Sequence, residues 1–198
     1  DHVVRPYLGG SVAVSDRRAD GGKSQDVYCY LSQWLGRFHE LGVGKSLQFY
    51  VNVKNPQLFT TAQTELLKGQ VVEVIARTYD PIRRDCMEMP QVASGDFVVT
   101  KPTQAGPRIK LIACRNMLRN MTPAKILHGI LEAHWDWGGR DFRLAPLEAE
   151  TVLKGLTRAL GADGARAWLS DYRGQLRAGT FREQGPLTHH ALTVLGIR

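Results

Sequence analysis

The chain has 198 residues, of which 43% are hydrophobic and 23% are charged, and its formal net charge is +7. The length suits one well-buried core, and the composition is that of an ordinary globular domain, which excludes the disordered and fibrous classes. No apolar run approaches the ~18 residues that span a bilayer, so we expect a soluble protein without a membrane partner.

The location of the protein is predicted from its N-terminus and its cysteines. Residues 1–5 have neither the basic start nor the apolar stretch of a signal peptide, although a chain that begins with Asp1 rather than Met is compatible with processing or truncation. Cys29, Cys86 and Cys114 form no C-x-x-C motif and are odd in number, so we expect thiols without a disulfide. The cytoplasm is therefore the predicted compartment.

The first predicted element is a helix over residues 24–41. Its apolar residues recur at spacings of three and four, namely Val27, Leu31, Trp34, Leu35, Phe38 and Leu41. Ser24 suits an N-cap and Gly42 suits a left-handed stop. So wide an apolar stripe must cover something, so Trp34, Leu35 and Phe38 are expected to be buried against a sheet.

A βαβ crossover is predicted next. Residues 46–53 and 70–78 are rich in β-branched and aromatic residues, as strands are, and the helical segment 56–67 separates them. Asn55 and Pro56 suit the start of that helix, and Gly69 suits its stop. Strand, helix and strand in this order favour two parallel strands joined by a right-handed crossover.

The rest of the chain completes a mixed α+β (α/β) domain over residues 1–198. Residues 8–14, 96–100 and 108–114 are further strand candidates, which gives a central sheet of about five or six strands in the sheet-rich part, 1–120. The part 121–198 is predicted to be all helical. Its expected helices are 122–135, 147–160, 162–176 and 186–195, with Gly161 between the middle two.

Three motifs with possible chemistry have simpler structural explanations. Gly42 to Ser46 ends in Gly-Lys-Ser, but a phosphate loop needs an earlier Gly where His39 stands, and a strand before the loop rather than a helix. His128, Glu132 and Asp136 share one predicted helix face, which suits a solvated polar surface better than a metal site. His189 and His190 are adjacent, so their side chains diverge. No metal or cofactor is predicted.

The positive charge is concentrated between residues 81 and 120, where seven basic residues stand against three acidic ones. Clustered positive charge attracts polyanions, and arginine suits bidentate phosphate contact. We therefore predict a nucleic-acid-binding protein or subunit that contacts backbone phosphate through the segment 81–119. The predicted contact residues are Arg83, Arg84, Lys101, Arg108, Lys110, Arg115 and Arg119.

Two other functions compete with this prediction. The helical part 121–198 suits a structural or adaptor subunit that packs on a protein partner. An enzyme acting on nucleic acid or a phosphorylated substrate is the third reading, with His128, Glu132 and Asp136 as its first candidate residues. The sequence does not distinguish DNA from RNA as the ligand. It also does not determine the oligomeric state or any sequence preference.

Overall fold

The computed structural model confirms a mixed α+β fold, with three helices and eleven strands among the residues that it describes. The described residues are 6–15, 24–32, 35–43, 48–87, 96–103, 105–112, 117–132, 134–136, 141–143, 149–181, 193 and 195–196. The helices are α1 (Thr61–Arg77), α2 (Pro123–Glu132) and α3 (Ala149–Arg177). The strands are β1 (Pro6–Ser15), β2 (Ser24–Ser32), β3 (Phe38–Val43), β4 (Phe49–Asn52), β5 (Gln57–Leu58), β6 (Cys86–Met87), β7 (Phe97–Thr100), β8 (Ile109–Leu111), β9 (Met117–Leu118), β10 (His134–Asp136) and β11 (Asp141–Arg143).

The main sheet has five strands in the order β5-β4-β3-β7-β8, and every neighbouring pair in it is antiparallel. The described chain also forms three two-stranded pairs, β1–β2, β6–β9 and β10–β11. The predicted strand count is therefore met by this sheet, whereas the predicted βαβ crossover is wrong. The first of its strands is present as β4, but residues 70–78 belong to α1 and its C-cap.

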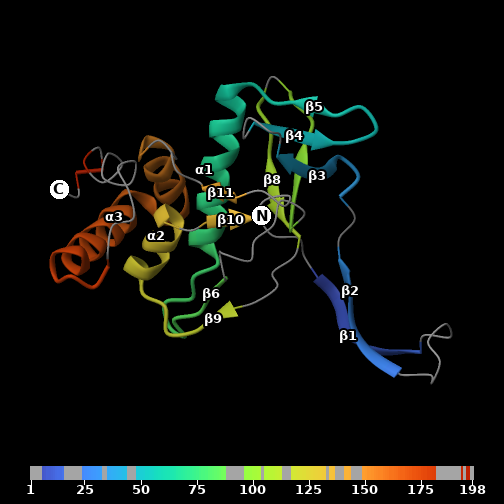
Figure 1. The fold of residues 1–198 in the computed structure, drawn as a ribbon, viewed down its shortest axis with the longest axis horizontal. Helices are drawn as coiled ribbons and strands as arrows, with labels where there is room; N and C mark the ends of the chain where they lie inside the picture. The colour runs from blue at the N-terminus through green and yellow to red at the C-terminus, as the bar shows by residue number, and fades with distance from the viewer. Residues whose placement is uncertain are drawn as a thin grey trace.

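Helix α1 accounts for this difference because it is buried over most of its second half. Its start is fixed by a capping box in which Thr60 and Gln63 bond to each other's backbone N–H groups. Figure 1 shows α1 between the sheet on one side and α2 and α3 on the other. Every residue from Val71 to Ala76 is buried. A helix that is surrounded by apolar neighbours has no polar face, so its β-branched run resembles a strand in sequence.

The predicted N-terminal helix over residues 24–41 is also corrected. The structure has strand β2 over part of this segment and strand β3 after it, with a turn at Gly36 and Arg37. Val27, Tyr28 and Tyr30 belong to the β-branched and aromatic residues that are enriched in strands. This local strand propensity outweighs the helical spacing of the larger apolar residues.

The burial expected for this segment is corrected with it. Leu35 and Phe38 are half-buried rather than buried, and Trp34 lies outside the described residues. Phe38 stands at the first position of β3, opposite Thr100 of β7. Leu41, further along β3, is buried in the core, and Val43 packs against this core.

Two glycines predicted to stop helices have other roles. Gly42 lies inside β3, where its backbone faces the ring of Tyr50 on β4. Gly69 lies inside α1 and is buried against α3, because a Cβ on Gly155 would stand only 2.5 Å from the Gly69 carbonyl oxygen. Gly42 and Gly155 thus permit a close approach that a side chain would block.

The C-terminal part is helical in outline but contains one short hairpin. Helix α2 begins at the predicted Pro123 and ends at Glu132, after which β10 and β11 pair antiparallel, so this part is not all helical. Helix α3 is kinked at Gly161, whose φ of 74° separates two helical stretches as predicted. Of the expected helix 186–195, only residues 193 and 195 are among those described.

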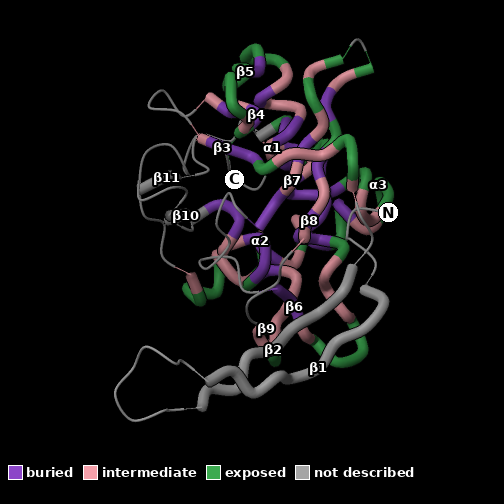
Figure 2. Tube along the Cα trace, turned by 90° about the vertical axis from the view of Figure 1, so that its right-hand side faces the viewer, coloured by how far each residue is buried: buried purple, intermediate pink, exposed green. Residues whose placement is uncertain are grey.

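The core lies where the inner face of the sheet meets α1, and it continues to α2 and α3. Figure 2 shows the buried positions concentrated along these elements. Phe49, Val51, Phe97, Val99, Ile109 and Leu111 from the sheet are all buried. In the part of the chain that the structure describes, none of the helices combines the length and apolarity needed to cross a membrane.

Candidate functional site

The structure places six of the seven basic residues predicted to contact phosphate, and it separates them into two groups. Arg83 and Arg84 lie in a turn closed by the Asp80–Asp85 bridge, beyond the C-terminal end of α1. Arg119 follows β9 and belongs near this turn, because the backbone N–H of Met121 donates to the Arg84 carbonyl. Lys101 and Arg108 belong instead to the loop between β7 and β8, and Lys110 belongs to β8. Arg115 lies outside the described residues.

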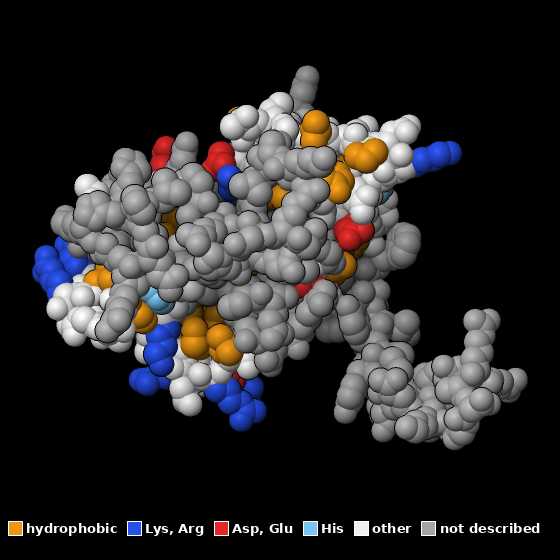
Figure 3. Space-filling model, in the orientation of Figure 1, with side chains coloured by type: hydrophobic (Ala, Val, Ile, Leu, Met, Phe, Trp, Pro, Cys, Tyr) orange, Lys and Arg blue, Asp and Glu red, His pale blue; other side chains and the backbone are white. Residues whose placement is uncertain are grey.

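The 80–85 turn is held by Asp80. Its Oδ1 accepts hydrogen bonds from the backbone N–H groups of Ile82 (2.8 Å) and Arg83 (3.1 Å). These bonds, with the one to Arg83 the stronger cause, hold the pKa of Asp80 below its ordinary value. Arg83 Nε also lies 3.9 Å from Asp80 Oδ2, so one basic group of the turn already has an acidic neighbour. In Figure 3, Lys and Arg side chains gather along the lower edge, below β6 and β9, and at the α3 end.

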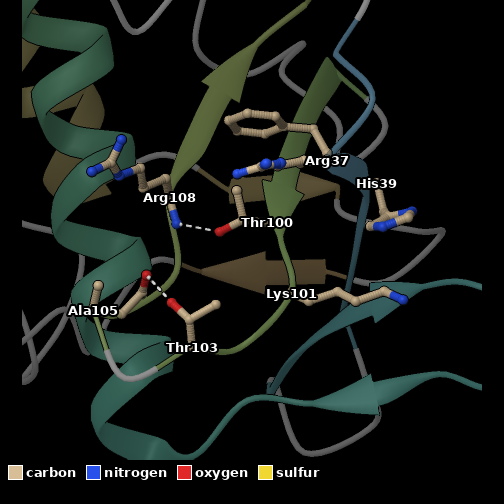
Figure 4. A pocket seen from close by; sticks show the side chains of 9 residues that line it. Arg37, His39, Thr100, Lys101, Thr103, Ala105 and Arg108 are labelled. Atoms are coloured by element: carbon tan, nitrogen blue, oxygen red, sulfur yellow. Dashed lines mark hydrogen bonds between the residues drawn. The ribbon is translucent and has the colours of Figure 1, made fainter.

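Two residues of the second group, Lys101 and Arg108, line an open pocket of about 610 Å³ between the start of β3, the end of β7 and the following loop. Arg37 and His39 line it from the start of β3, and Lys101 and Arg108 line it from the β7–β8 connection. Figure 4 shows the Arg37 side chain crossing β7 toward Arg108, while Lys101 points the other way. Arg37, Lys101 and Arg108 form no ion pair with any carboxylate among the described residues, so their charges are available to a ligand.

A second pocket of about 630 Å³ adjoins the first one. The two share Phe38, Ala105 and Arg108, and the second continues over the edge strand β8 to α1 and α3. Lys110 and Arg158 add two more cations to its lining. A third, smaller pocket between α1 and α3 shares Arg158 and Leu66 with the second and is also lined by Lys154. We call these three adjoining pockets the basic groove.

The carboxylates that line the basic groove are neutralised by cations on the same helix. Glu73 Oε1 lies 3.1 Å from Arg77 Nε, and Glu65 Oε1 lies 2.5 Å from Lys68 Nζ. Neither Arg77 nor Lys68 is among the lining residues. Lys154 is paired with Glu150 at 2.7 Å, which lowers the pKa of Glu150. The five remaining lining cations, Arg37, Lys101, Arg108, Lys110 and Arg158, therefore dominate the field of the groove.

Arg108 is the best-positioned cation of the groove because its backbone is held from both sides. Its N–H donates to Thr100 Oγ1 (2.9 Å), and its carbonyl accepts from the Thr100 N–H (2.9 Å). On the other side, Gln70 Nε2 donates to the Pro107 carbonyl, and Gln70 Oε1 accepts from the Ile109 N–H, both at 2.9 Å. A helix side chain thus replaces the missing neighbour of an edge strand.

Sequence reasoning missed the cations that come from outside the basic segment. Arg37 stands directly before β3, and Arg158 lies on α3, so the fold rather than the sequence brings them beside Arg108. For α3 one signal was available, since Lys154 and Arg158 are four residues apart and share a helix face. For Arg37 the sequence holds no such signal.

The alternative catalytic set is not brought together as predicted. Helix α2 ends at Glu132 and Asp136 lies in β10, so the shared helix face of His128, Glu132 and Asp136 does not exist. His128 instead has its Nδ1 3.1 Å from the Tyr172 hydroxyl and stacks on Phe181, and burial lowers its pKa. No group of three or more potential metal ligands occurs among the residues whose side chains are described. His189 and His190 lie outside the described residues.

Comparison with known protein families, with curated proteins and with solved structures found no match for this chain. Its function is therefore inferred from the basic groove. The features that matter are the charges of the groove, the aromatic side chain of Phe38 and the hydrogen bonds that hold the backbone of Arg108.

Proposed function

We propose that the protein binds nucleic acid by contacting backbone phosphates along the basic groove. The observation that carries this proposal is that the three pockets share lining residues and gather cations from four separate parts of the chain. Arg37, Lys101, Arg108, Lys110 and Arg158 border the groove and form no ion pair within the described residues, and its two acidic lining residues are neutralised from outside. Cations gathered around adjoining pockets can meet several of the successive charges on a phosphate backbone.

Three of the predicted contact residues belong to the proposed site, and Arg83, Arg84 and Arg119 do not. Lys101, Arg108 and Lys110 are in the groove. Arg83, Arg84 and Arg119 are at the far end of α1, where Arg83 is next to Asp80. A single contiguous contact through all seven residues is therefore not what we propose, and the 80–85 turn becomes a matched control.

The test compares two double variants that remove the same charge. Lys101→Gln with Arg108→Gln alters the groove, and Arg83→Gln with Arg84→Gln alters the turn; all four side chains are exposed. Binding of fluorescent single- and double-stranded oligonucleotides is measured over a range of salt concentrations. We expect the slope of log K against log salt to flatten by about 1.4–1.8 in the groove variant, because each lost contact removes about 0.7–0.9. The turn variant should keep the slope of the unmodified protein.

Two results would contradict the proposal. Equal flattening in both variants would mean that total charge alone determines binding. An absence of binding to any oligonucleotide at low salt would remove the function for this chain, and the predicted adaptor role, with a protein partner on residues 121–198, would replace it. The predicted cytoplasmic location is compatible with either function and is tested separately by localising the tagged protein in cells.

A further inference from the structure

Phe38 occupies the junction of the basic groove. It lines both of the larger pockets together with Arg108, and its side chain is half-buried rather than enclosed in the core. In the sheet, Phe38 of β3 is paired with Thr100 of β7, and the backbone N–H of Thr100 donates a hydrogen bond to the Arg108 carbonyl on its other side. An aromatic ring is thus held between two basic depressions by the register of three strands.

We infer that the groove takes unpaired bases, so that its ligand is single-stranded nucleic acid, with a base stacked on Phe38 and phosphates on the cations to either side. This inference rests on the proposed function and specifies its ligand. Arg37 and Lys101 line only the first of the two pockets that meet at Phe38, and Lys110 and Arg158 line only the second. A strand that crosses Phe38 therefore meets positive charge before and after the stacked base.

Duplex nucleic acid does not satisfy the same arrangement. Both faces of a paired base are covered by its neighbours in the helix, so a duplex offers the groove only its backbone. An unpaired base has an accessible π-face, and stacking on an aromatic side chain next to a positively charged groove is the usual mode of single-strand binding. The aromatic ring is thus a feature that backbone contact alone does not require.

The position of Lys110 is consistent with this use of the ring. Its Nζ lies 5.7 Å from the centroid of the Phe38 ring, within the range of a weak cation–π contact. The lysine side chain is long and flexible, so it can turn to a phosphate while a base takes its place over the ring. Lys110 then exchanges one favourable contact for a stronger, charged one.

The experiment uses the full chain and oligonucleotides of about 12 nucleotides, which lies within the site sizes of known single-strand binders. Oligothymidine, oligouridine and a duplex of equal length are compared at one salt concentration. We expect both single strands to bind more tightly than the duplex. Equal affinity for DNA and RNA supports contact through base and phosphate alone, and tighter RNA binding supports an added contact to the 2′-hydroxyl group.

Phe38→Leu removes the ring but keeps an apolar side chain. Loss of one base–aromatic stack should weaken single-strand binding by about 5- to 150-fold and leave duplex binding unchanged. Phe38→Trp, which keeps an aromatic ring, should bind single strands at least as tightly as the unmodified protein. This variant still tests the stacking if the leucine variant does not fold. The control is Phe181→Leu, since Phe181 is also half-buried but stacks on His128 away from the groove.

The inference is overturned if the duplex binds as tightly as the single strands, or if Phe38→Leu binds single strands normally. Failure of the inference differs from failure of the proposed function. If the variant of Lys101 and Arg108 still flattens the salt dependence while Phe38→Leu has no effect, the groove binds phosphate but not unpaired bases. If neither variant has an effect, the groove is not the site.

Discussion

The side-chain amide of Gln70 holds the backbone on both sides of Arg108, with one hydrogen bond to the Pro107 carbonyl and one from the Ile109 N–H. Ile109 is buried, so its N–H has no access to water as an alternative partner. An amide is the side chain that suits this position, because it donates and accepts at once. Helix α1 therefore controls where the central cation of the basic groove is placed.

Gln70→Leu is expected to destabilise the protein by about 1–3 kcal/mol, because it leaves the buried Ile109 N–H without an acceptor. Denaturant unfolding measures the loss, and hydrogen exchange should show faster exchange at the Ile109 amide.

Gln70→Glu separates the two hydrogen bonds of this residue. The carboxylate still accepts from Ile109 but faces the Pro107 carbonyl, so this variant should be less stable than the unmodified protein at neutral pH. Below the pKa of the new carboxyl group the protonated oxygen donates to Pro107, and the difference should shrink. An unchanged unfolding midpoint in both variants would show that this bridge adds nothing.

Part of the fold could be predicted because its signals are local. Pro123 marks the start of α2, Gly161 marks the kink of α3, and the alternating residues of β4 and β7 are recognisable as strands. The errors occurred where tertiary context outweighs local pattern. Residues 70–78 have strand propensity but are helical because the capping box at Thr60 starts a helix and burial on all sides sustains it.

The candidate site could be predicted only where it coincides with the basic segment. Lys101, Arg108 and Lys110 are close in sequence, and charge counting finds them. Arg37 and Arg158 reach the same groove from β3 and α3, and that meeting depends on strand order and helix packing. The same dependence explains why Arg83 and Arg84 belong elsewhere: α1 extends between them and the groove instead of ending at Gly69.

The close contact between α1 and α3 gives a second prediction. A Cβ on Gly155 would lie 2.5 Å from the Gly69 carbonyl oxygen and 2.7 Å from Val72 Cβ, and neither atom can move without shifting a buried helix. Gly155→Ala should therefore cost about 3 kcal/mol or more. Gly174→Ala is the matched control on α3, where no atom lies within 4 Å of the new Cβ, and it should stabilise by up to ~1 kcal/mol. Similar unfolding curves for the two variants would contradict this packing.

His128 predicts how stability depends on pH. Burial lowers its pKa below the ordinary value of 6.5, so the folded protein binds this proton less tightly than the unfolded chain does. The stability that this difference gives to the folded protein is fully present above pH 6.5. It is lost as the pH falls from 6.5 through the pKa of His128 in the folded state. Asp80 and Glu150 have lowered pKa values too. Their ordinary values are 3.8 and 4.5, so their effect on stability falls at more acidic pH than that of His128.

His128→Gln tests this prediction because it removes the titrating group and keeps a polar side chain. Unfolding free energies at about pH 7.5 and about pH 5.5 are compared for the two proteins. The unmodified protein should lose more stability over this interval than His128→Gln does. An equal loss would assign the pH dependence to other groups.

Gly42 and Tyr50 give the last prediction. They are paired across β3 and β4, and a Cβ on Gly42 would lie 2.2 Å from Cζ of the Tyr50 ring, with two further ring atoms within 2.7 Å. The tyrosine ring therefore covers the glycine, as aromatic side chains do next to glycines in designed sheets. Gly42→Ala should displace the ring toward solvent and cost about 1–3 kcal/mol. The cost is limited because the obstructing atoms are at the end of a side chain that can rotate. A double-mutant cycle isolates the contact, since in a Tyr50→Ala background the Gly42→Ala substitution should cost much less. If its cost is the same in both backgrounds, the backbone of β3 rather than the ring is what requires glycine.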